Sequence, residues 1–252
     1  MLVDDLSKIT LMQGDCLERM KEIPSGSVDM ILTDPPYGTT ACKWDSIIPL
    51  EPMWEQLKRI IKPNGVIVMT ASQPFTTTLI ASNMKMFKYC WVWEKNRQSG
   101  FVQCKNKPMT KHEDVCVFSS GVTVHVGQSK KRMIYNPQGL VKVDRVGRGA
   151  TPSKGAGGVT KRPSHKKEVY QEFTNYPNTV LKFNSERGLH PTQKPVALME
   201  YLINTYTNEN ETVLDFTMGS GSTGVAAKNL NRNFIGIELD ESYFNIAKER
   251  IG

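Results

Sequence analysis

The stretch TVLDFTMGSGSTG, residues 212–224, decides the fold of this chain. Residues 212–214 form a short apolar run typical of a strand, and Ser222 and Thr223 are residue types that favour the start of a helix. A turn between such a strand and helix lies at the carboxyl end of the strand, where open α/β sheets bind their ligands. We therefore predict an α/β fold with a nucleoside-cofactor site in this loop.

Three glycines of the loop, Gly219, Gly221 and Gly224, match the pattern Gly-x-Gly-x-x-Gly. That pattern alone is weak, because dinucleotide enzymes and S-adenosylmethionine enzymes both carry it. Glu238 ends the next strand-like run, where its carboxylate is placed to accept hydrogen bonds from ribose hydroxyls. Glu238 favours a nucleoside site over a plain glycine-rich turn.

Two details favour S-adenosylmethionine as the cofactor. The strand ends in Asp215 and Phe216, and Asp215 lies four residues before the first glycine, so the loop is longer than the tight dinucleotide turn. The hydroxyls of Ser222 and Thr223, with the helix N-terminus, suit one small carboxylate such as that of methionine.

A second loop carries the motif Asp34-Pro35-Pro36-Tyr37, which follows the apolar run 28–32. The exocyclic amino group of a base is a poor nucleophile because its lone pair is delocalised into the ring. The Asp34 carboxylate and the Pro35 carbonyl are adjacent acceptors for its two hydrogens, and proline stiffens the loop that aims them. Tyr37 offers a flat face to an extruded base. The motif predicts direct methyl transfer, with a rigid turn as the alternative.

The rest of the chain alternates strand-like and helix-like segments, which predicts a mostly parallel sheet with right-handed crossovers. Apolar spacing predicts strands at 9–12, 28–32, 66–69, 89–93, 115–118, 212–216 and 234–237. It predicts helices at 16–23, 50–61, 73–83, 195–206, 222–230 and after Asp240. Residues 121–187 break this rhythm, with short β-like pieces at 122–126 and 141–143. We interpret them as an insertion between a catalytic half, 1–120, and a cofactor-binding half, 188–252.

Positive charge is concentrated in this insertion. The chain has a net charge of +7, and residues 121–187 carry thirteen Lys or Arg against four acids. A nearly neutral body with one basic segment favours a polyanionic partner, and a solvated loop is the alternative. The candidate DNA-binding residues are Lys130, Lys131, Arg132, Lys142, Arg145, Arg148, Lys161, Arg162, Lys166 and Lys167.

Composition narrows the protein class further. The N-terminus lacks the basic start and apolar stretch of a signal peptide, and no apolar run reaches the roughly 20 residues of a membrane span. Five cysteines form no compact framework, so we expect reduced thiols in a cytoplasmic protein. Cys104, His112 and Cys116 lack the paired spacing of a zinc site, and we expect no metal.

At the two motifs the chain resembles the amino-group DNA methyltransferases, which methylate adenine N6 or cytosine N4 with S-adenosylmethionine. The Asp34 motif precedes the glycine loop and a basic segment lies between them, an order similar to the β-group of that family. The resemblance covers most of the chain. It implies a Rossmann-like methyltransferase fold with a circularly permuted motif order, whose insertion is the target recognition segment. Asp at the first catalytic position resembles the adenine enzymes.

The resemblance also assigns cofactor contacts. It implies that Asp15, next to Cys16, accepts from the cofactor adenine, and that Phe216 packs on that ring. It implies that Glu238 holds the ribose and that Thr192 and Lys194, in His190-Pro191-Thr192-Gln193-Lys194-Pro195, hold the methionine carboxylate. Asp34, Asp215, Gly219, Gly221, Ser222 and Thr223 complete the expected cofactor site.

Three functions therefore stay open. The first is a site-specific enzyme that methylates adenine N6 in double-stranded DNA, as a homodimer, either with a cognate restriction endonuclease or alone. The second is methylation of another amino group: cytosine N4, RNA or a glutamine amide, although in the amide enzymes the glycine loop comes first. The third is a non-catalytic DNA-binding relative, against which the intact Asp34, Tyr37, Gly219, Gly221 and Glu238 argue.

Overall fold

The computed structural model describes residues 8–38, 46–123, 129–148, 168–186, 188 and 193–252. The chain forms two compact units, and each is considered by itself. The larger contains the residues up to Asn136 and those from Thr179 onwards, and the smaller is Pro137–Asn178. The predicted insertion, 121–187, contains the whole of the smaller unit.

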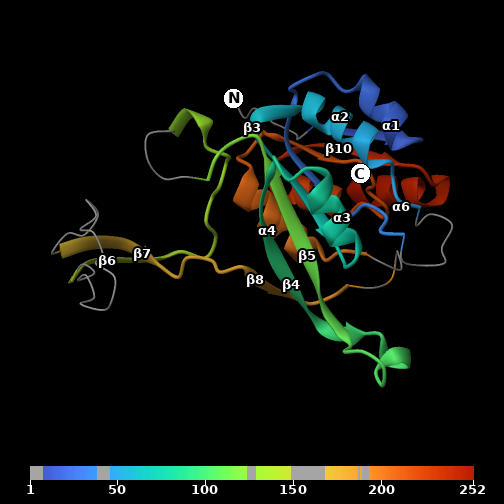
Figure 1. Cartoon of the computed structure of the whole chain (residues 1–252). Helices are drawn as coiled ribbons and strands as arrows, with labels where there is room; N and C mark the ends of the chain where they lie inside the picture. Colours follow the sequence, from blue (N-terminus) through green and yellow to red (C-terminus); the bar gives the residue numbers. More distant parts are fainter. Residues whose placement is uncertain (1–7, 39–45, 124–128, 149–167, 187, 189–192) are drawn as a thin grey trace. The chain divides into compact units, whose positions relative to one another are not determined.

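An eight-stranded sheet organises the larger unit, in the order β1-β10-β9-β2-β3-β5-β4-β8 (Figure 1). Pairing is parallel except where β5 lies antiparallel to β3 and to β4, so the prediction of a mostly parallel sheet is confirmed. The strands are β1 (Ile9–Gln13), β2 (Val28–Thr33), β3 (Ile61–Ala71), β4 (Phe87–Ser99), β5 (Thr110–Ser119), β8 (Val180–Phe183), β9 (Thr212–Asp215) and β10 (Asn233–Glu238).

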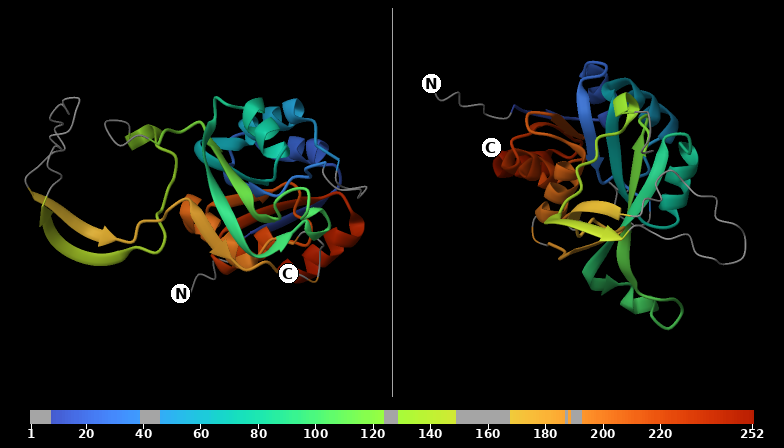
Figure 2. Two further views of the ribbon diagram at one scale, coloured as in Figure 1. Left: turned by 60° about the horizontal axis from the view of Figure 1, so that its bottom comes forward. Right: turned by 90° about the vertical axis from the view of Figure 1, so that its left-hand side faces the viewer.

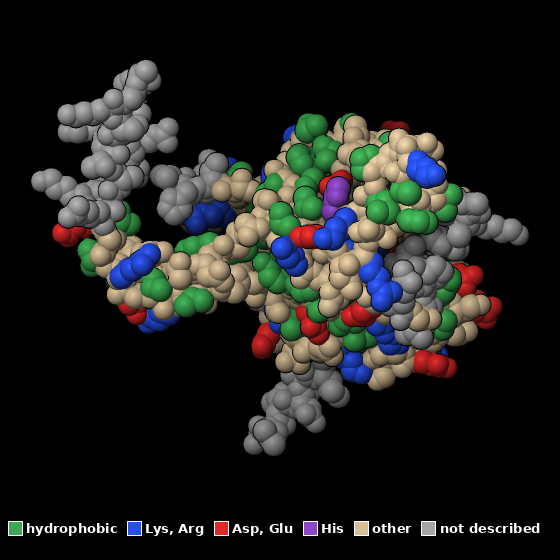
Figure 3. Space-filling model, turned by 90° about the horizontal axis from the view of Figure 1, so that it is seen from below, with side chains coloured by type: hydrophobic (Ala, Val, Ile, Leu, Met, Phe, Trp, Pro, Cys, Tyr) green, Lys and Arg blue, Asp and Glu red, His purple; other side chains and the backbone are tan. Residues whose placement is uncertain are grey.

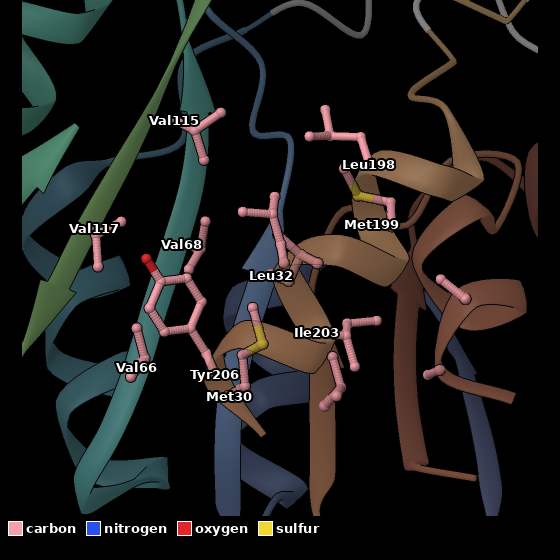
Figure 4. Packing of buried hydrophobic residues seen from close by; sticks show 14 of the residues in the cluster. Met30, Leu32, Val66, Val68, Val115, Val117, Leu198, Met199, Ile203 and Tyr206 are labelled. Atoms are coloured by element: carbon pink, nitrogen blue, oxygen red, sulfur yellow. The ribbon is translucent and has the colours of Figure 1, made fainter. Parts of the chain in front are cut away.

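Helices cover both faces of this sheet. Successive residues of a strand point to opposite faces, and β3 follows this rule: Val66 and Val68 join one core cluster, whereas Ile67 and Met69 join the other. The first cluster contains residues of α4 (Val196–Tyr206), α5 (Ser222–Asn229) and α6 (Glu241–Ile251). Figure 4 shows Tyr206 and Ile203 of α4 close to Met30, Leu32 and Val66 of the central strands.

The second cluster lies on the opposite face. Residues of α1 (Cys16–Arg19), the 3₁₀ helix η1 (Met20–Glu22), α2 (Leu50–Ile60) and α3 (Phe75–Ser82) pack there. Because β2 contributes to both clusters and is buried along its whole length, it is a central strand, as its near-continuous apolar run predicts. None of the described helices is long and apolar enough to cross a membrane.

Three local predictions need correction. Residues 16–23 form one short α-helix followed by a 3₁₀ turn, because the α-helical part ends at Arg19. The N-cap of α5 is Gly221, and Ser222 and Thr223 are already helical. The strands expected at 89–93 and 115–118 are the inner parts of longer strands, β4 and β5, whose outer ends are polar and exposed. Asp240, by contrast, caps α6 as predicted, because its carboxylate accepts from the Ser242 and Tyr243 amides at 2.9 and 3.1 Å.

The smaller unit contains a two-stranded antiparallel ribbon of β6 (Val141–Arg148) and β7 (Glu168–Thr174), as Figure 2 shows. The β-like piece predicted at 141–143 is therefore the start of a longer strand. Of the piece predicted at 122–126, Val122 forms a single bridge with Arg132, and residues 124–126 lie outside the described residues.

Candidate active site

Four neighbouring parallel strands bring the sequence motifs to one edge of the sheet. β1, β10, β9 and β2 lie side by side, and each is followed by a loop at its carboxyl end. These loops surround a cavity of about 1270 Å³. Of the predicted residues, its lining includes Asp15, Cys16, Asp34, Pro35, Pro36, Tyr37, Lys194, Asp215, Phe216, Gly219, Ser222, Thr223 and Glu238.

The glycine loop after β9 is held in an open turn. Gly219 and Gly221 have φ angles of 51° and 82°, in the left-handed region that favours glycine. The Gly219 amide donates to Glu238 Oε2 at 2.8 Å, and the Asp240 amide donates to Oε1 at 2.9 Å. Burial raises the pKa of the Glu238 carboxyl above its ordinary value. Glu238 thus lies at the end of β10, as the sequence predicts, and its carboxylate also orders the glycine loop.

Asp215 is a buried carboxylate without a basic partner among the described residues. Its Oδ1 accepts from the Thr33 hydroxyl at 2.8 Å and from the Thr217 amide at 3.1 Å. Burial raises the pKa of Asp215 to about 6. A buried acid whose donors are all neutral gains most from a cationic ligand, and the ammonium group of S-adenosylmethionine is one.

Asp34 is fixed by three donors from three separate elements. Its Oδ1 accepts from the Tyr37 hydroxyl at 2.6 Å and from the Thr70 hydroxyl of β3, and its Oδ2 accepts from the Lys194 ammonium. The Thr217 hydroxyl donates to the Asp34 backbone carbonyl at 3.1 Å, which joins the glycine loop directly to the Asp-Pro-Pro-Tyr loop. The two motifs identified in the sequence are therefore one hydrogen-bonded assembly.

The Lys194 ammonium binds the Asp34 carboxylate and does not point into open space in the cavity. Its ammonium also lies 3.4 Å from Glu113 Oε2, and Glu113 Oε1 accepts from Lys95 at 2.9 Å. Burial alone would lower the pKa of Lys194, but the carboxylates of Asp34 and Glu113 outweigh it and raise that pKa. The expected contact of Lys194 with a methionine carboxylate therefore competes with an ion pair to the catalytic loop.

The Tyr37 ring stacks on Phe75, with centroids 5.4 Å apart and planes 23° apart, and the Lys194 ammonium lies 5.9 Å from its centroid. Burial and the neighbouring Asp34 raise the pKa of Tyr37 well above its ordinary value, so its hydroxyl stays protonated and donates. Phe216 is buried in the second core cluster and also lines the cavity. Burial raises the pKa of Cys16 to about 12, which keeps this thiol neutral.

Some predicted residues are engaged by the chain itself, lie away from the cavity or are not described. Asp15 Oδ1 caps α1 by accepting from the Leu17 amide at 2.8 Å, which leaves mainly its other oxygen for a ligand. Gly221 does not line the cavity, because its Cα packs against α6. Thr192 lies outside the described residues.

The predicted DNA contacts lie elsewhere. Lys130, Lys131 and Arg132 belong to the larger unit and do not line the cavity, and Lys142 and Arg145 are exposed on the ribbon. Arg148 ends β6, and its side chain is not described. Lys161, Arg162, Lys166 and Lys167 lie outside the described residues.

Five residues that sequence reasoning did not single out belong to the site. They are Thr33, Thr70, Lys95, Glu113 and Thr217. The signal that could have found these two threonines is position: Thr33 directly precedes Asp34, and Thr217 lies within the stretch 212–224. Lys95 and Glu113 stand in no motif, because they meet only when β4 pairs with β5.

A parallel sheet whose strand ends join a glycine loop to an Asp-Pro-Pro-Tyr loop defines a methyltransferase that uses S-adenosylmethionine. The family model described as a DNA methylase of the N6/N4 type matches residues 28–249. The chain therefore belongs to the N6/N4 DNA methylase family, and S-adenosylmethionine is its methyl donor.

Known proteins resemble it over nearly its full length. The type II methyltransferase M.HpaI of Haemophilus parainfluenzae is 27% identical over 96% of this chain and 73% of its own. The crystal structure of an M1.HpyAVI complex with S-adenosylmethionine matches with a TM-score of 0.62 and 28% identity, over 96% of this chain and 99% of the other. The cytosine-N4-specific PvuII DNA methyltransferase matches with a TM-score of 0.68 at 15% identity, over 98% and 87%. That last likeness shows the fold alone.

Proposed function

We propose that this protein is a site-specific DNA methyltransferase that transfers the methyl group of S-adenosylmethionine to the N6 amino group of an adenine flipped out of duplex DNA. The observation that carries this proposal is the fixed Asp34 carboxylate, tied to the glycine loop through Thr217. Asp at this position, the trait of the adenine enzymes that the sequence resembles, supports adenine over cytosine.

Asp34 acts in this proposal as a hydrogen-bond acceptor. A carboxylate has about four acceptor positions, so three donors leave about one for an amino hydrogen of the base. The Pro35 carbonyl accepts a hydrogen bond from the second amino hydrogen as the nitrogen becomes pyramidal. The Asp34 carboxylate cannot rotate without breaking its hydrogen bonds to Tyr37, Thr70 and Lys194. It is therefore oriented before the substrate arrives. Tyr37 contributes its ring to the wall that receives the base.

The proposed cofactor residues can be grouped by the part of S-adenosylmethionine that each would hold. Asp215 would hold the ammonium group, Glu238 the ribose, and the α5 N-terminus with Ser222 and Thr223 the carboxylate. Asp15, Cys16 and Phe216 would surround the adenine ring. When bound, S-adenosylmethionine supplies an electrophilic methyl group on a sulfonium, and the chain's part is to hold donor and base in line.

Further parts of the proposal rest on the sequence, the first on its charge and the others on its resemblance to the family. The basic residues of the insertion bind DNA phosphates, which position the duplex without reading its sequence. The order of the motifs is a circular permutation of the methyltransferase fold, and the protein acts as a homodimer. It works either beside a cognate restriction endonuclease or alone.

The test is single-molecule sequencing of genomic DNA from a methylation-free host that expresses the chain. We expect N6-methyladenine in one sequence motif and none with Asp34→Ala, which should keep S-adenosylmethionine binding and lose at least about 100-fold in turnover. N4-methylcytosine at the motif would establish the cytosine alternative. An unmodified genome from folded, cofactor-binding protein would contradict DNA methylation and favour RNA or a binding function.

A further inference from the structure

The hairpin that joins β4 to β5 ends in a well-defined tip. The tip is the 3₁₀ helix η2 (Phe101–Gln103), seen at the green end of the hairpin in Figure 1. The Gln103 amide donates to the Gly100 carbonyl at 3.0 Å, and the Cys104 amide donates to the Phe101 carbonyl at 3.1 Å. Gly100 has a φ of 91°, which lets the chain turn here. The tip is therefore a fixed structure at the end of two paired strands.

Two large apolar side chains are exposed at this tip. Phe101 is 77% exposed and Val102 is 96% exposed. Adjacent apolar side chains are unfavourable in water, and an exposed apolar pair at the end of a projecting element is a candidate interaction site. Within the described residues they pack against little of the chain, which leaves them available to contact another molecule.

The charge of the hairpin indicates what that molecule is. Residues 95–112 contain five Lys or Arg and no acid. Lys95 and Lys111 form ion pairs with Glu113 and Glu94. Arg97, Lys105 and Lys107 are exposed and form no ion pair within the described part of the chain. Figure 3, seen from the side of the hairpin, shows basic and hydrophobic side chains exposed on the same face. Apolar groups flanked by unpaired cations fit a polyanion with stacked apolar interiors, which is duplex DNA.

The hairpin also borders the catalytic cavity. Arg97 and Ser99 of β4 and Thr110 of β5 line the same cavity as Asp34 and Tyr37. All of these residues belong to the larger unit, so their placement does not depend on the ribbon. A duplex that contacts the tip therefore lies beside the cavity that contains Asp34.

We propose that the β4–β5 tip is the wedge that opens the duplex. Phe101 and Val102 enter the base stack beside the target nucleotide, while Arg97, Lys105 and Lys107 bind the flanking phosphates. Apolar wedges of this kind unstack base steps, and the space they fill is the space that a flipped base leaves. This inference rests on the proposed methylation of duplex DNA and adds the element that exposes the base.

The test compares Phe101→Ala/Val102→Ala with Met84→Ala, a control that removes another exposed apolar side chain, 61% exposed and outside the cavity lining. The substrates are a duplex with the methylated motif found by sequencing and the same duplex with an abasic site opposite the target base. We expect the double variant to bind S-adenosylmethionine normally and to methylate the paired duplex at least about 10-fold more slowly. Since the target base of the second substrate has no pairing partner, its extrusion costs less, and we expect less than about a 3-fold loss on it.

A second measurement separates opening from chemistry. With 2-aminopurine at the target position, we expect the wild-type protein and Met84→Ala to raise the fluorescence of the duplex, and the double variant not to. Equal methylation rates for the double variant and Met84→Ala on the paired duplex would overturn the wedge. An equal loss for the double variant on the paired duplex and on the duplex with the abasic site would also overturn it. A changed oligomeric state in sedimentation would overturn it in favour of a contact between copies. An inactive wild-type protein would reject the proposed function itself, whereas an active one with an unaffected double variant rejects the wedge alone.

Discussion

Glu113 connects two lysines of the catalytic cavity. Its Oε1 accepts from Lys95, and its buried Oε2 has no hydrogen-bond partner within the described residues but lies 3.4 Å from the Lys194 ammonium. Because Lys194 also binds Asp34, Glu113 acts on the catalytic acceptor through that lysine.

Glu113→Gln should therefore lower kcat without a matching rise in the KM for S-adenosylmethionine. The neutral amide leaves two lysines with less negative charge between them, so Lys194 pulls harder on Asp34. We expect a loss of roughly 10- to 100-fold, the range of one disturbed charged hydrogen bond, in steady-state kinetics. Lys111→Gln, which removes an exposed ion pair with Glu94, is the control. A kcat equal to that control would show that Glu113 does not position the site.

Cofactor affinity should depend on pH through Asp215. Its pKa is raised to about 6 by burial, and the ionised form is the one that binds an ammonium group. Affinity should therefore rise as pH increases through 6, by about 10-fold between pH 5 and pH 7. Without the cofactor the raised pKa has the opposite effect, because stability falls as pH rises from the ordinary Asp value towards 6.

Calorimetric titration of S-adenosylmethionine at several pH values would measure this dependence. Asp215→Asn should bind more weakly at pH 7 and lose the rise near pH 6. A wild-type affinity that stays flat across this range would show that Asp215 does not pair with the cofactor.

Single residues were predictable where a motif follows a strand. Asp34 and Glu238 could be placed from the sequence because strand ends of a parallel sheet meet at one edge. Glu113, Thr70 and Lys194 could not be joined to Asp34, since their positions lie 79, 36 and 160 residues away along the chain and nothing in their spacing records the pairing of β3 with β5. The roles of the site residues stay predictions.

At the scale of elements, the packing of α5 against α6 leaves little space for a side chain at Gly221. A Cβ at Gly221 would lie 2.9 Å from Ile251 Cδ1 and 3.1 Å from the Ala247 Cβ of α6, in addition to the strain of its positive φ. Gly26 has a positive φ of 63° but open space around it. A comparison of substitutions at Gly221 and Gly26 therefore separates the cost of steric conflict from the cost of backbone strain.

Gly221→Ala should therefore lower the free energy of unfolding by about 2–4 kcal/mol, and Gly26→Ala by about 1–2 kcal/mol. Urea denaturation followed by circular dichroism would measure both. The glycine loop precedes α5, so only the first variant should also weaken S-adenosylmethionine binding. Equal destabilisation by the two variants would contradict tight packing between α5 and α6.

Elements were predictable where they are buried. The central strands are apolar runs, and α4 and α6 have helical apolar spacing. The type and the order of these strands and helices could therefore be predicted from the sequence. The outer halves of β4 and β5 did not, because residues 94–99 and 110–112 are mostly polar and exposed and carry no apolar signal. The charge pattern also indicated the insertion and not the hairpin, because the hairpin's five basic residues are separated along residues 95–111 and form no run.

At the scale of the whole molecule, basic residues are spread over both units. Lys130, Lys131 and Arg132 belong to the larger unit, and Lys142 and Arg145 belong to the ribbon. Replacing these five by Gln should weaken DNA binding and flatten its salt dependence, because each lost phosphate contact reduces the slope of log K against log salt by about 0.9. Fluorescence anisotropy at several salt concentrations measures the slope, with Lys21→Gln/Lys58→Gln as control. An unchanged slope would place the DNA elsewhere on the protein.

The pairing of β2 with β9 also constrains how the enzyme is made. β2 leaves the ribosome about 180 residues before β9, and β1 leaves it more than 200 residues before β10. Closing such long loops is slow, and until they close the apolar edge of β2 has no partner. In the nascent chain that edge is therefore the kind of surface that is prone to aggregation. Because Asp34 and Thr217 meet only after translation reaches the last strands, a product that ends before β9 lacks the bond that joins the two loops of the site.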